Sequence, residues 1–435
     1  MMTEVTVGAP RTLAGPGWPG IAASITIDGR TFDIFFRASQ GPLTFRADPF
    51  LALALLPAMR TGLPLRLEGA VSARLLRNTS VFQDVICTWY PSIFQKITIH
   101  AATGVPAEQP SQTGAFFSGG VDSFYTAITR QDELSHLILI HGLDISLDDQ
   151  PMRQKVSLAL RQACAELGKP LLEVETNMRT ILDAYTGWSR DSHGAALASV
   201  ALALAPQFRK VYISATHTYD HICAHGSHPL IDPLWSTEET EIIQGGVETG
   251  RWQKLRSMLD NQTVRRYLRS CWEHPQGAYN CCHCSICLMN MSFLRLCGVS
   301  DHFPTYPQPL DLAELARFPV HSPAPNMGWS RLLLEVEMVG GDSALAQALR
   351  TVLSADPGAT AWFGQTPAEQ AHLHQFSAQV HQVEDHVKRL HQMDARIAEL
   401  EQQLTRMETS HSWRLTAPLR ALGGLAHHSG REGAT

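Results

Sequence analysis

The chain has 435 residues and a mass of 48.0 kDa, which favours two or three domains over a single core. Hydrophobic residues make up 44% and charged residues 17%, a composition that excludes an extended disordered protein. The formal net charge of -6 argues against a general polyanion-binding surface, so we expect no nucleic-acid partner. There is no N-terminal secretion signal, and the longest apolar run, 195–205, is shorter than the ~20 residues of a membrane span. We therefore expect a cytoplasmic protein.

Residues 1–110 carry the signals of a small β-rich domain with one helix. Two strand-like runs, 25–27 and 31–36, flank Asp28-Gly29, and this arrangement predicts a β-hairpin. Further strands are predicted at 65–67 and 96–99, and the apolar block from Phe50 to Met59 predicts a helix. A polar, proline-containing linker at 106–112 ends this part of the chain.

Residues 111–303 alternate between short apolar strands and helices. Strands are predicted at 115–117, 137–140, 171–174 and 211–213, and helices at 122–130, 152–167 and 194–204. This alternation predicts an α/β fold with a doubly wound parallel sheet. Because ligands of such sheets bind at the carboxyl ends of the strands, we expect a site at that edge.

The most specific motif is Ser118-Gly119-Gly120-Val121-Asp122-Ser123, which lies between a predicted strand and a predicted helix. The glycines allow the backbone to approach an anion, the helix start contributes amide donors, and the serines contribute hydroxyls. An ordinary strand-to-helix turn is the alternative for a two-glycine loop. The complete six-residue string in this position favours a phosphate-binding loop.

This string resembles the signature of the PP-loop ATP pyrophosphatases, whose fold is of the adenine nucleotide alpha-hydrolase type. In that family the loop binds the β- and γ-phosphates, and ATP is cleaved between the α- and β-phosphates to place AMP on a substrate oxygen. The resemblance implies that Ser118, Gly119, Gly120 and Ser123 hold phosphate, and that Asp122 orients the loop or a Mg²⁺ ion.

Four polar residues follow the predicted strands or begin a helix at the edge where substrate is expected: His141, Arg179, His193 and His217. The resemblance places the backbone near His141 beside the adenine, and the other three are substrate candidates. Taken singly, each histidine is better explained as a capping or buried residue, and the shared edge position makes the two explanations equal only for the set. The polar loop 226–238 adds Ser227, His228 and Asp232 as substrate candidates, with a rigid surface loop as the alternative.

Five of the nine cysteines lie between Cys271 and Cys287. A secreted disulfide framework does not have this distribution. The spacing C-x9-C-x2-C-x2-C of Cys271, Cys281, Cys284 and Cys287 predicts four thiolate ligands for a structural Zn²⁺. An iron–sulfur cluster is the alternative, because it is also held by four thiolates.

The cysteine array resembles that of the 7-cyano-7-deazaguanine synthases, and residues 24–298 resemble a related group of uncharacterised bacterial proteins. We call residues 280–291, which contain the last three cysteines of the array, the knuckle. In the related group this segment carries a glycine, an arginine and a threonine where this chain has Cys282, Met289 and Asn290. A substrate-contacting lysine of the synthases is also missing, with Thr240 near its place. The deazaguanine substrate is therefore not implied, whereas metal ligation is.

The remainder of the chain predicts a helical extension at 304–365, a coiled coil at 366–411 and a flexible tail at 412–435. Apolar residues recur at spacings of three and four from Leu373 to Met407, so we expect a homo-oligomer or a partner protein bound through the coil. The segment 412–420 resembles one that follows coiled coils in bacterial glycosyltransferases and other cell-surface glycan proteins. Trp413 and its arginine and leucine neighbours would also allow peripheral membrane contact.

These features predict an ATP-dependent adenylating enzyme that uses ATP, Mg²⁺ and Zn²⁺. A carboxylate or amide oxygen of a small molecule would be activated for C–N bond formation, in cell-surface glycan or modified-nucleobase biosynthesis. The alternative is a non-catalytic nucleotide- and zinc-binding scaffold that acts through its coiled coil.

Overall fold

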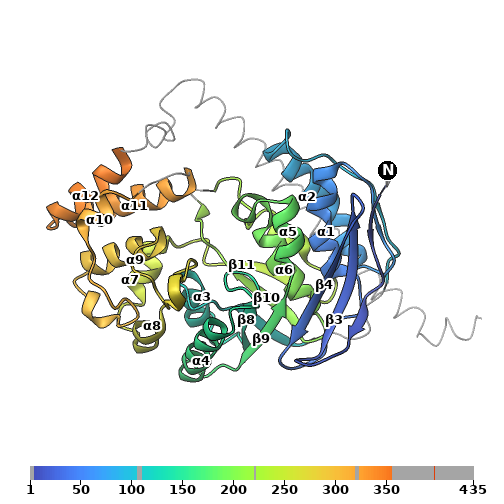
Figure 1. Cartoon of the computed structure of the whole chain (residues 1–435), viewed down its shortest axis with the longest axis horizontal. Helices are drawn as coiled ribbons and strands as arrows, with labels where there is room; N and C mark the ends of the chain where they lie inside the picture. Colours follow the sequence, from blue (N-terminus) through green and yellow to red (C-terminus); the bar gives the residue numbers. More distant parts are fainter. Residues whose placement is uncertain (1–3, 105–109, 220–221, 319–322, 355–395, 397–435) are drawn as a thin grey trace, which may run out of the picture. The chain divides into compact units, whose positions relative to one another are not determined.

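The computed structural model describes residues 4–104, 110–219, 222–318, 323–354 and 396 (Figure 1). Contacts divide the chain into two units, Met1–Phe363 and Gly364–Thr435, and the first of these is described below. The predicted coiled coil and tail lie outside the described residues, apart from Arg396. Within the described part of the chain, no helix is long and apolar enough to cross a membrane.

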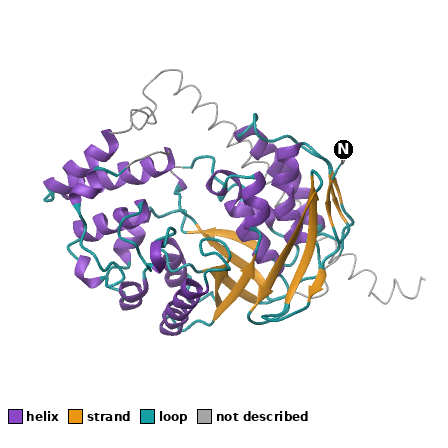
Figure 2. Ribbon diagram, in the orientation of Figure 1, coloured by secondary structure: helices purple, strands orange, loops and turns teal. Residues whose placement is uncertain are grey.

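The described part of the first unit is an α/β structure with one large mixed sheet (Figure 2). Its path is β11-β10-β7-β8-β9-β4-β3-β1-β5-β6, with β2 paired to β3. The strands are β1 (Val5–Val7), β2 (Arg11–Leu13), β3 (Gly20–Ile27), β4 (Arg30–Ala38), β5 (Leu65–Leu67), β6 (Ile99–His100), β7 (Gln112–Phe116), β8 (His136–His141), β9 (Leu171–Thr176), β10 (Phe208–Ser214) and β11 (Glu241–Gly245).

Strands β7 to β11 form a parallel block in the order β11-β10-β7-β8-β9. In the central strand β7, Ala115 is paired with Tyr212 of β10 on one side and Leu137 of β8 on the other. The continuous apolar runs that predicted these strands are buried, as in sheets covered on both faces. Because the chain runs from β7 to β8 and later returns to place β10 on the other side of β7, the strand order reverses between β7 and β10.

The N-terminal strands continue the same sheet. Strand β4 pairs antiparallel with β9, with Phe36 opposite Thr176 and Ala38 opposite Val174. The predicted hairpin is present as β3 and β4, and both of its turn residues, Asp28 and Gly29, have positive φ, as a type I′ turn requires. The expected boundary near residue 110 lies between β6 and β7, and the strands on its two sides belong to one sheet.

Helices cover both faces of the sheet. Buried residues of α3 and α4 share a hydrophobic core with those of α7, α9, α11 and α12, whereas α1 packs against α5 and α6 (Figures 1 and 2). The described α-helices are α1 (Asp48–Thr61), α2 (Ala73–Trp89), α3 (Val121–Thr129), α4 (Gln150–Glu166), α5 (Arg179–Tyr185), α6 (His193–Ala203), α7 (Arg251–Ser257), α8 (Gln262–Tyr267), α9 (Ser285–Leu296), α10 (Leu312–Ala316), α11 (Pro323–Val339) and α12 (Ser343–Ser354).

Helix α2 is the largest element that sequence patterns did not predict. It begins after Ser72, whose Oγ accepts a hydrogen bond from the Leu75 amide as a helix cap. Its buried face mixes apolar residues with polar side chains such as Asn78 and Gln83. The helical extension expected at 304–365 contains α10, α11 and α12, and Gly340 and Gly341 take positive φ where α11 ends before α12.

Candidate functional site

The predicted phosphate loop joins the end of β7 to the start of α3. Gly119 has a φ of 78°, and a Cβ atom at this position would lie 2.8 Å from Cδ2 of Leu160. The Gly119 carbonyl accepts a hydrogen bond of 2.8 Å from the Arg269 amide. Both the backbone conformation and the close packing therefore require glycine.

The two serines of the loop have different environments. Ser118 is exposed, and its Oγ lies 3.4 Å from the Gly120 amide. Ser123 is buried, and its Oγ donates a 3.0 Å hydrogen bond to the Gly120 carbonyl. Gly120 and Val121 begin α3, whose first amides have no partner within the helix. The loop thus offers backbone donors and the Ser118 hydroxyl to an anion.

Asp122 binds two cations of α7. Its Oδ2 lies 2.8 Å from Nη1 of Arg251, and its Oδ1 lies 3.1 Å from Nζ of Lys254. Lys254 is 1% exposed and also donates to the Ala215 carbonyl at 2.6 Å. Burial raises the pKa of Asp122, but the charges of Lys254 and Arg251 outweigh it, so the net shift is downward. A carboxylate at the start of α3 therefore holds two positive charges beside the loop.

His141 lies apart from these charges, in a pair with Glu173. Its Nε2 is 2.8 Å from Oε2 of Glu173, and its Nδ1 has no hydrogen-bond partner among the described residues. Burial raises the pKa of Glu173, but hydrogen bonds from His141, Ser157 and Arg161 lower it to about 2. The His141 side chain at the end of β8 is thus buried and held in place by Glu173.

Three histidines form a second group near the loop. The rings of His217 and His225 are 5.0 Å apart, and His193 lies 6.2 Å from His225. Burial, together with the positive electrostatic effect of His225, lowers the pKa of both His193 and His217 to about 4. These side chains are therefore neutral at pH 7, although the nearby carboxylate of Asp122 favours the charged form of His217.

Arg179 joins this group through an aromatic ring. Its guanidinium lies 4.3 Å from the ring centre of Trp188, which in turn is 5.0 Å from the His193 ring. Arg179 also forms an ion pair of 2.9 Å with Asp183 on the next turn of α5. The expected rim residues Arg179, His193 and His217 therefore lie in one neighbourhood, together with Trp188 and His225.

The three candidates of the loop 226–238 are buried. Asp232 Oδ2 accepts hydrogen bonds of 2.7 Å from Ser227 Oγ and from Gln244 Nε2, and its Oδ1 has no hydrogen-bond partner within the described structure. Burial raises the pKa of Asp232 to about 7. His228 packs edge-on against Trp89 at 4.9 Å, and burial lowers its pKa to about 3. These residues form the interior of the loop rather than its surface.

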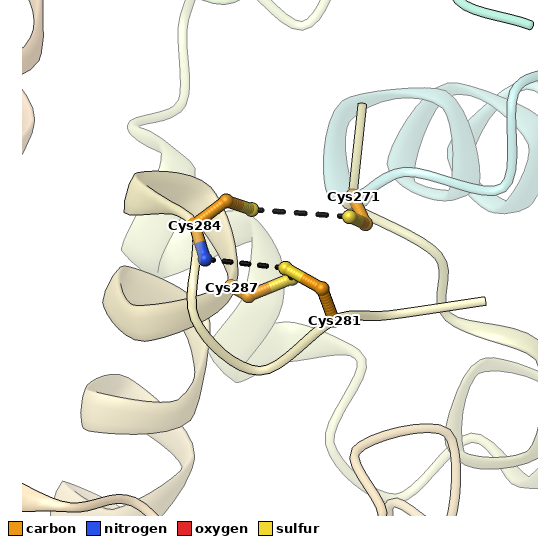
Figure 3. A group of neighbouring side chains, drawn as sticks. All are labelled: Cys271, Cys281, Cys284 and Cys287. Carbon is orange, nitrogen blue, oxygen red and sulfur yellow. Dashed lines mark hydrogen bonds between the residues drawn. The ribbon is translucent and has the colours of Figure 1, made fainter. Parts of the chain in front are cut away.

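The four predicted metal ligands come together. One sulfur from each of Cys271, Cys281, Cys284 and Cys287 lies within 4.8 Å of the others, and all four side chains are buried (Figure 3). The Sγ atoms of Cys271 and Cys284 are 3.9 Å apart, and those of Cys281 and Cys287 are 4.0 Å apart. A tetrahedral ion with bonds of about 2.3 Å to sulfur requires a sulfur spacing of about 3.8 Å. The cluster could hold a metal ion such as zinc.

Backbone amides point at the sulfurs of this cluster. The amides of His283 and Cys284 donate to Cys281 Sγ at 3.4 and 3.2 Å, and that of His274 donates to Cys271 Sγ at 3.3 Å. Such donors stabilise thiolate charge. Cys282 has a φ of 66°, a left-handed backbone conformation that favours glycine.

A surface hollow of about 420 Å³ lies beside the cysteine knuckle. It is lined by Lys155, Tyr267, Tyr279 and neighbouring residues, and none of residues 118–123 contributes to it. Two of its polar side chains bind backbone carbonyls: Lys155 donates to Gly277 and Tyr279 donates to Tyr267. The hollow is therefore distinct from the loop site.

Sequence patterns missed Arg251, Lys254, His225, Trp188 and Gln244. Arg251 and Lys254 lie 129 and 132 residues beyond Asp122, so no local motif connects them to the loop. Their spacing of three places both on one face of a helix, which was the available signal. Comparison of the chain with models of protein families, with curated proteins and with solved structures finds no match.

Proposed function

We propose that the protein is an ATP-dependent adenylating enzyme of the PP-loop type. One observation carries the proposal: the loop 118–123 leaves the central strand β7 beside the reversal of strand order, and Asp122 holds Arg251 and Lys254 next to it. Open sheets bind their ligands at such reversals. A helix start with two adjacent cations matches the charge of a triphosphate.

The strand order of the parallel block supports the same assignment. Numbered along the chain, the strands lie in the order 3-2-1-4-5, and the loop follows strand 1. This order is compatible with the adenine nucleotide alpha-hydrolase type of fold, which we propose for residues 111–303.

In the proposed reaction, the loop amides and Ser118 bind the β- and γ-phosphates of ATP. Arg251 and Lys254 offset the negative charge that develops as pyrophosphate leaves. Both oxygens of Asp122 already bind cations, so we assign this residue the positioning of Arg251 and Lys254. Mg²⁺ would enter on the phosphates of ATP and would neutralise part of their charge.

The acceptor would bind at the group formed by Arg179, Trp188, His193, His217 and His225. A carboxylate or amide oxygen of the acceptor attacks the α-phosphate, the bond to the β-phosphate breaks, and pyrophosphate leaves with its electron pair. A nitrogen nucleophile then displaces AMP from the activated carbon. Arg179 can pair with an acid, and the neutral imidazoles can accept hydrogen bonds from the nitrogen nucleophile.

For the cysteine cluster we propose one structural Zn²⁺. Four ligands of one ion lie close together, whereas the cysteines of a four-iron cluster each bind a different iron and must be farther apart. The sulfur spacing of 3.9 to 4.0 Å supports a single ion. Four protein ligands leave no open position, so the ion would stabilise the fold.

The test is release of AMP and pyrophosphate from ATP across a panel of small carboxylic acids, with ammonia as the nitrogen donor. We expect at least one acid to stimulate release in the wild-type protein, and Asp122→Ala and Lys254→Met to abolish this stimulation. If ATP binds but no acid stimulates release beyond that of Asp122→Ala, the protein is a nucleotide-binding scaffold and the enzymatic proposal is wrong.

A further inference from the structure

One short segment of the chain, residues 267–271, connects the phosphate loop with the cysteine cluster. The Arg269 amide donates to the Gly119 carbonyl at 2.8 Å, and Cys271 follows two residues later. The Tyr267 carbonyl would lie 3.7 Å from a Cβ atom at Gly119. Segment 267–271 therefore packs against the loop at one end and supplies a cluster ligand at the other.

The Asn280 side chain links this segment to the knuckle by hydrogen bonds. Its Oδ1 accepts hydrogen bonds from the amides of Ser270 and Cys271 at 2.9 and 3.2 Å. Its Nδ2 donates to the carbonyls of Leu268 and Thr305 at 2.9 and 3.1 Å. The side chain is 3% exposed and directly precedes Cys281. Ordering of the knuckle by a metal ion would consequently order segment 267–271.

Asn290 provides a second connection, which ends at the loop carboxylate. It lies on α9 one turn after Cys287 and is fully buried. Its Nδ2 donates to the Tyr306 hydroxyl at 3.0 Å, and its Oδ1 lies 3.5 Å from Nη2 of Arg251. The same arginine binds Asp122 at 2.8 Å through Nη1. Helix α9, which contains Cys287 and has Cys284 as its N-cap, thus also orients a cation of the loop site.

We infer that the cysteine cluster and the phosphate loop are thermodynamically coupled through Asn280 and Asn290. Metal bound by the four thiolates orders segment 267–271 and Arg251 before a phosphate ligand binds. The entropic cost of ordering them is therefore not subtracted from the binding free energy of that ligand. By linkage, the ligand tightens metal binding by the same factor. Asn290 acts as a positioning residue, since its described side-chain contacts reach the loop through Arg251. This inference rests on the proposed binding of ATP at the loop.

The experiment compares ATP binding by full-length protein before and after metal removal with a chelator, using calorimetry in the presence of Mg²⁺. We expect metal-loaded protein to bind ATP about tenfold more tightly. In the reciprocal measurement, saturating ATP slows the transfer of zinc from the protein to a chromogenic chelator. Circular dichroism identifies whether the metal-free protein remains folded.

Asn290→Leu keeps the four cysteines and a similar side-chain volume, so it tests the coupling even if metal removal unfolds the protein. We expect this variant to retain about one zinc per chain, to bind ATP about tenfold more weakly, and to release zinc at a rate that ATP no longer changes. Ser292→Ala is the matched control, because Ser292 is buried on the same helix and its Oγ has no hydrogen-bond partner in the described structure.

The outcomes separate the two proposals. If loaded wild-type protein does not bind ATP, the proposed function fails, and the coupling fails with it. If ATP binds equally well to loaded and metal-free folded protein, or if Asn290→Leu leaves both ATP affinity and zinc release unchanged, only the coupling is overturned. A merely structural role for Asn290 would lower stability while zinc release stayed sensitive to ATP.

Discussion

The phosphate loop and the cysteine cluster are assembled in different ways. All four cysteines lie between Cys271 and Cys287, and they meet around one point (Figure 3). The loop is even shorter in sequence, but its cations, Arg251 and Lys254 of α7, lie 129 and 132 residues beyond Asp122. A short stretch of sequence can thus reveal a complete set of metal ligands. The loop motif, in contrast, reveals the anion-binding backbone of the charged site but not its cations.

The largest expected effect is in the cluster. Cys284→Ser should reduce the bound metal from about one ion per chain to nearly none, because three thiolates and a hydroxyl no longer satisfy a tetrahedral soft site. Structural zinc contributes on the order of 10–16 kcal/mol in zinc-finger peptides, so thermal stability should fall sharply as well. Elemental analysis and thermal unfolding measure both effects.

Cys297→Ser is the control for this change, since Cys297 is half-buried and lies outside the cluster. It should retain its metal and unfold near the wild-type temperature. A Cys284→Ser protein with a full complement of metal would show that the four sulfurs do not act as one ligand set.

In the loop site, Lys254→Met should lower the free energy of unfolding by about 3 kcal/mol, the lower end of the range for breaking a buried ion pair. The loss is limited because Asp122 keeps Arg251 as a partner. Urea denaturation at pH 7 measures the effect, and Asp122→Asn combined with Lys254→Met should recover part of it.

Lys155→Met is the matched control, because Lys155 is exposed and donates only to a backbone carbonyl in the described contacts. It should change the free energy of unfolding by less than about 0.5 kcal/mol. Equal losses from the two lysine substitutions would refute the buried ion pair.

The third effect depends on pH. Burial raises the pKa of Asp232 from 3.8 to about 7, so the folded state binds a proton that the unfolded state has lost. This contribution favours folding at low pH and disappears as the pH rises from about 4 through 7. Asp232→Asn lacks the titration, so its stability relative to wild type should increase by roughly 2 kcal/mol between pH 5 and pH 8.

Urea denaturation at the two pH values gives this difference, with Asp301→Asn as an exposed control. A relative stability that stays constant between pH 5 and pH 8 would mean that Asp232 is ionised in the folded protein, and the buried network with Ser227 and Gln244 would need another description.

The smallest effect concerns Cys282. Its positive φ disfavours any side chain, so Cys282→Gly should be more stable than Cys282→Ala by about 1 kcal/mol, the reverse of the usual order. Both variants lose the same buried sulfur and should keep the metal. Thermal unfolding of the two proteins measures the difference, and a more stable alanine variant would contradict the backbone strain.

Sequence patterns predicted the strands whose side chains are all buried and the turn whose conformation depends on its own two residues. The parallel strands are continuous apolar runs buried on both faces, and the hairpin at Asp28-Gly29 follows from the conformational preference of its turn. Helix α2 was missed although Leu75, Phe82 and Ile86 recur at helical spacing, because polar residues lie among them on the buried face. Asn78, Thr79 and Gln83 form hydrogen bonds there. The pairing of β4 with β9 was also missed, since the register of strands far apart in sequence leaves no local pattern.

By itself, the sequence determined the loop motif and the cysteine spacing, because both depend on backbone conformation and ligand geometry within a few residues. Only the tertiary structure decided that Asp122 faces Arg251 and Lys254, that Arg179, His193 and His217 share a neighbourhood, and that Asn290 joins the cluster to the loop. The physical reason is the same in each case. These contacts depend on which strands are neighbours in the sheet and how the helices pack on it, and this depends on the burial of the whole core.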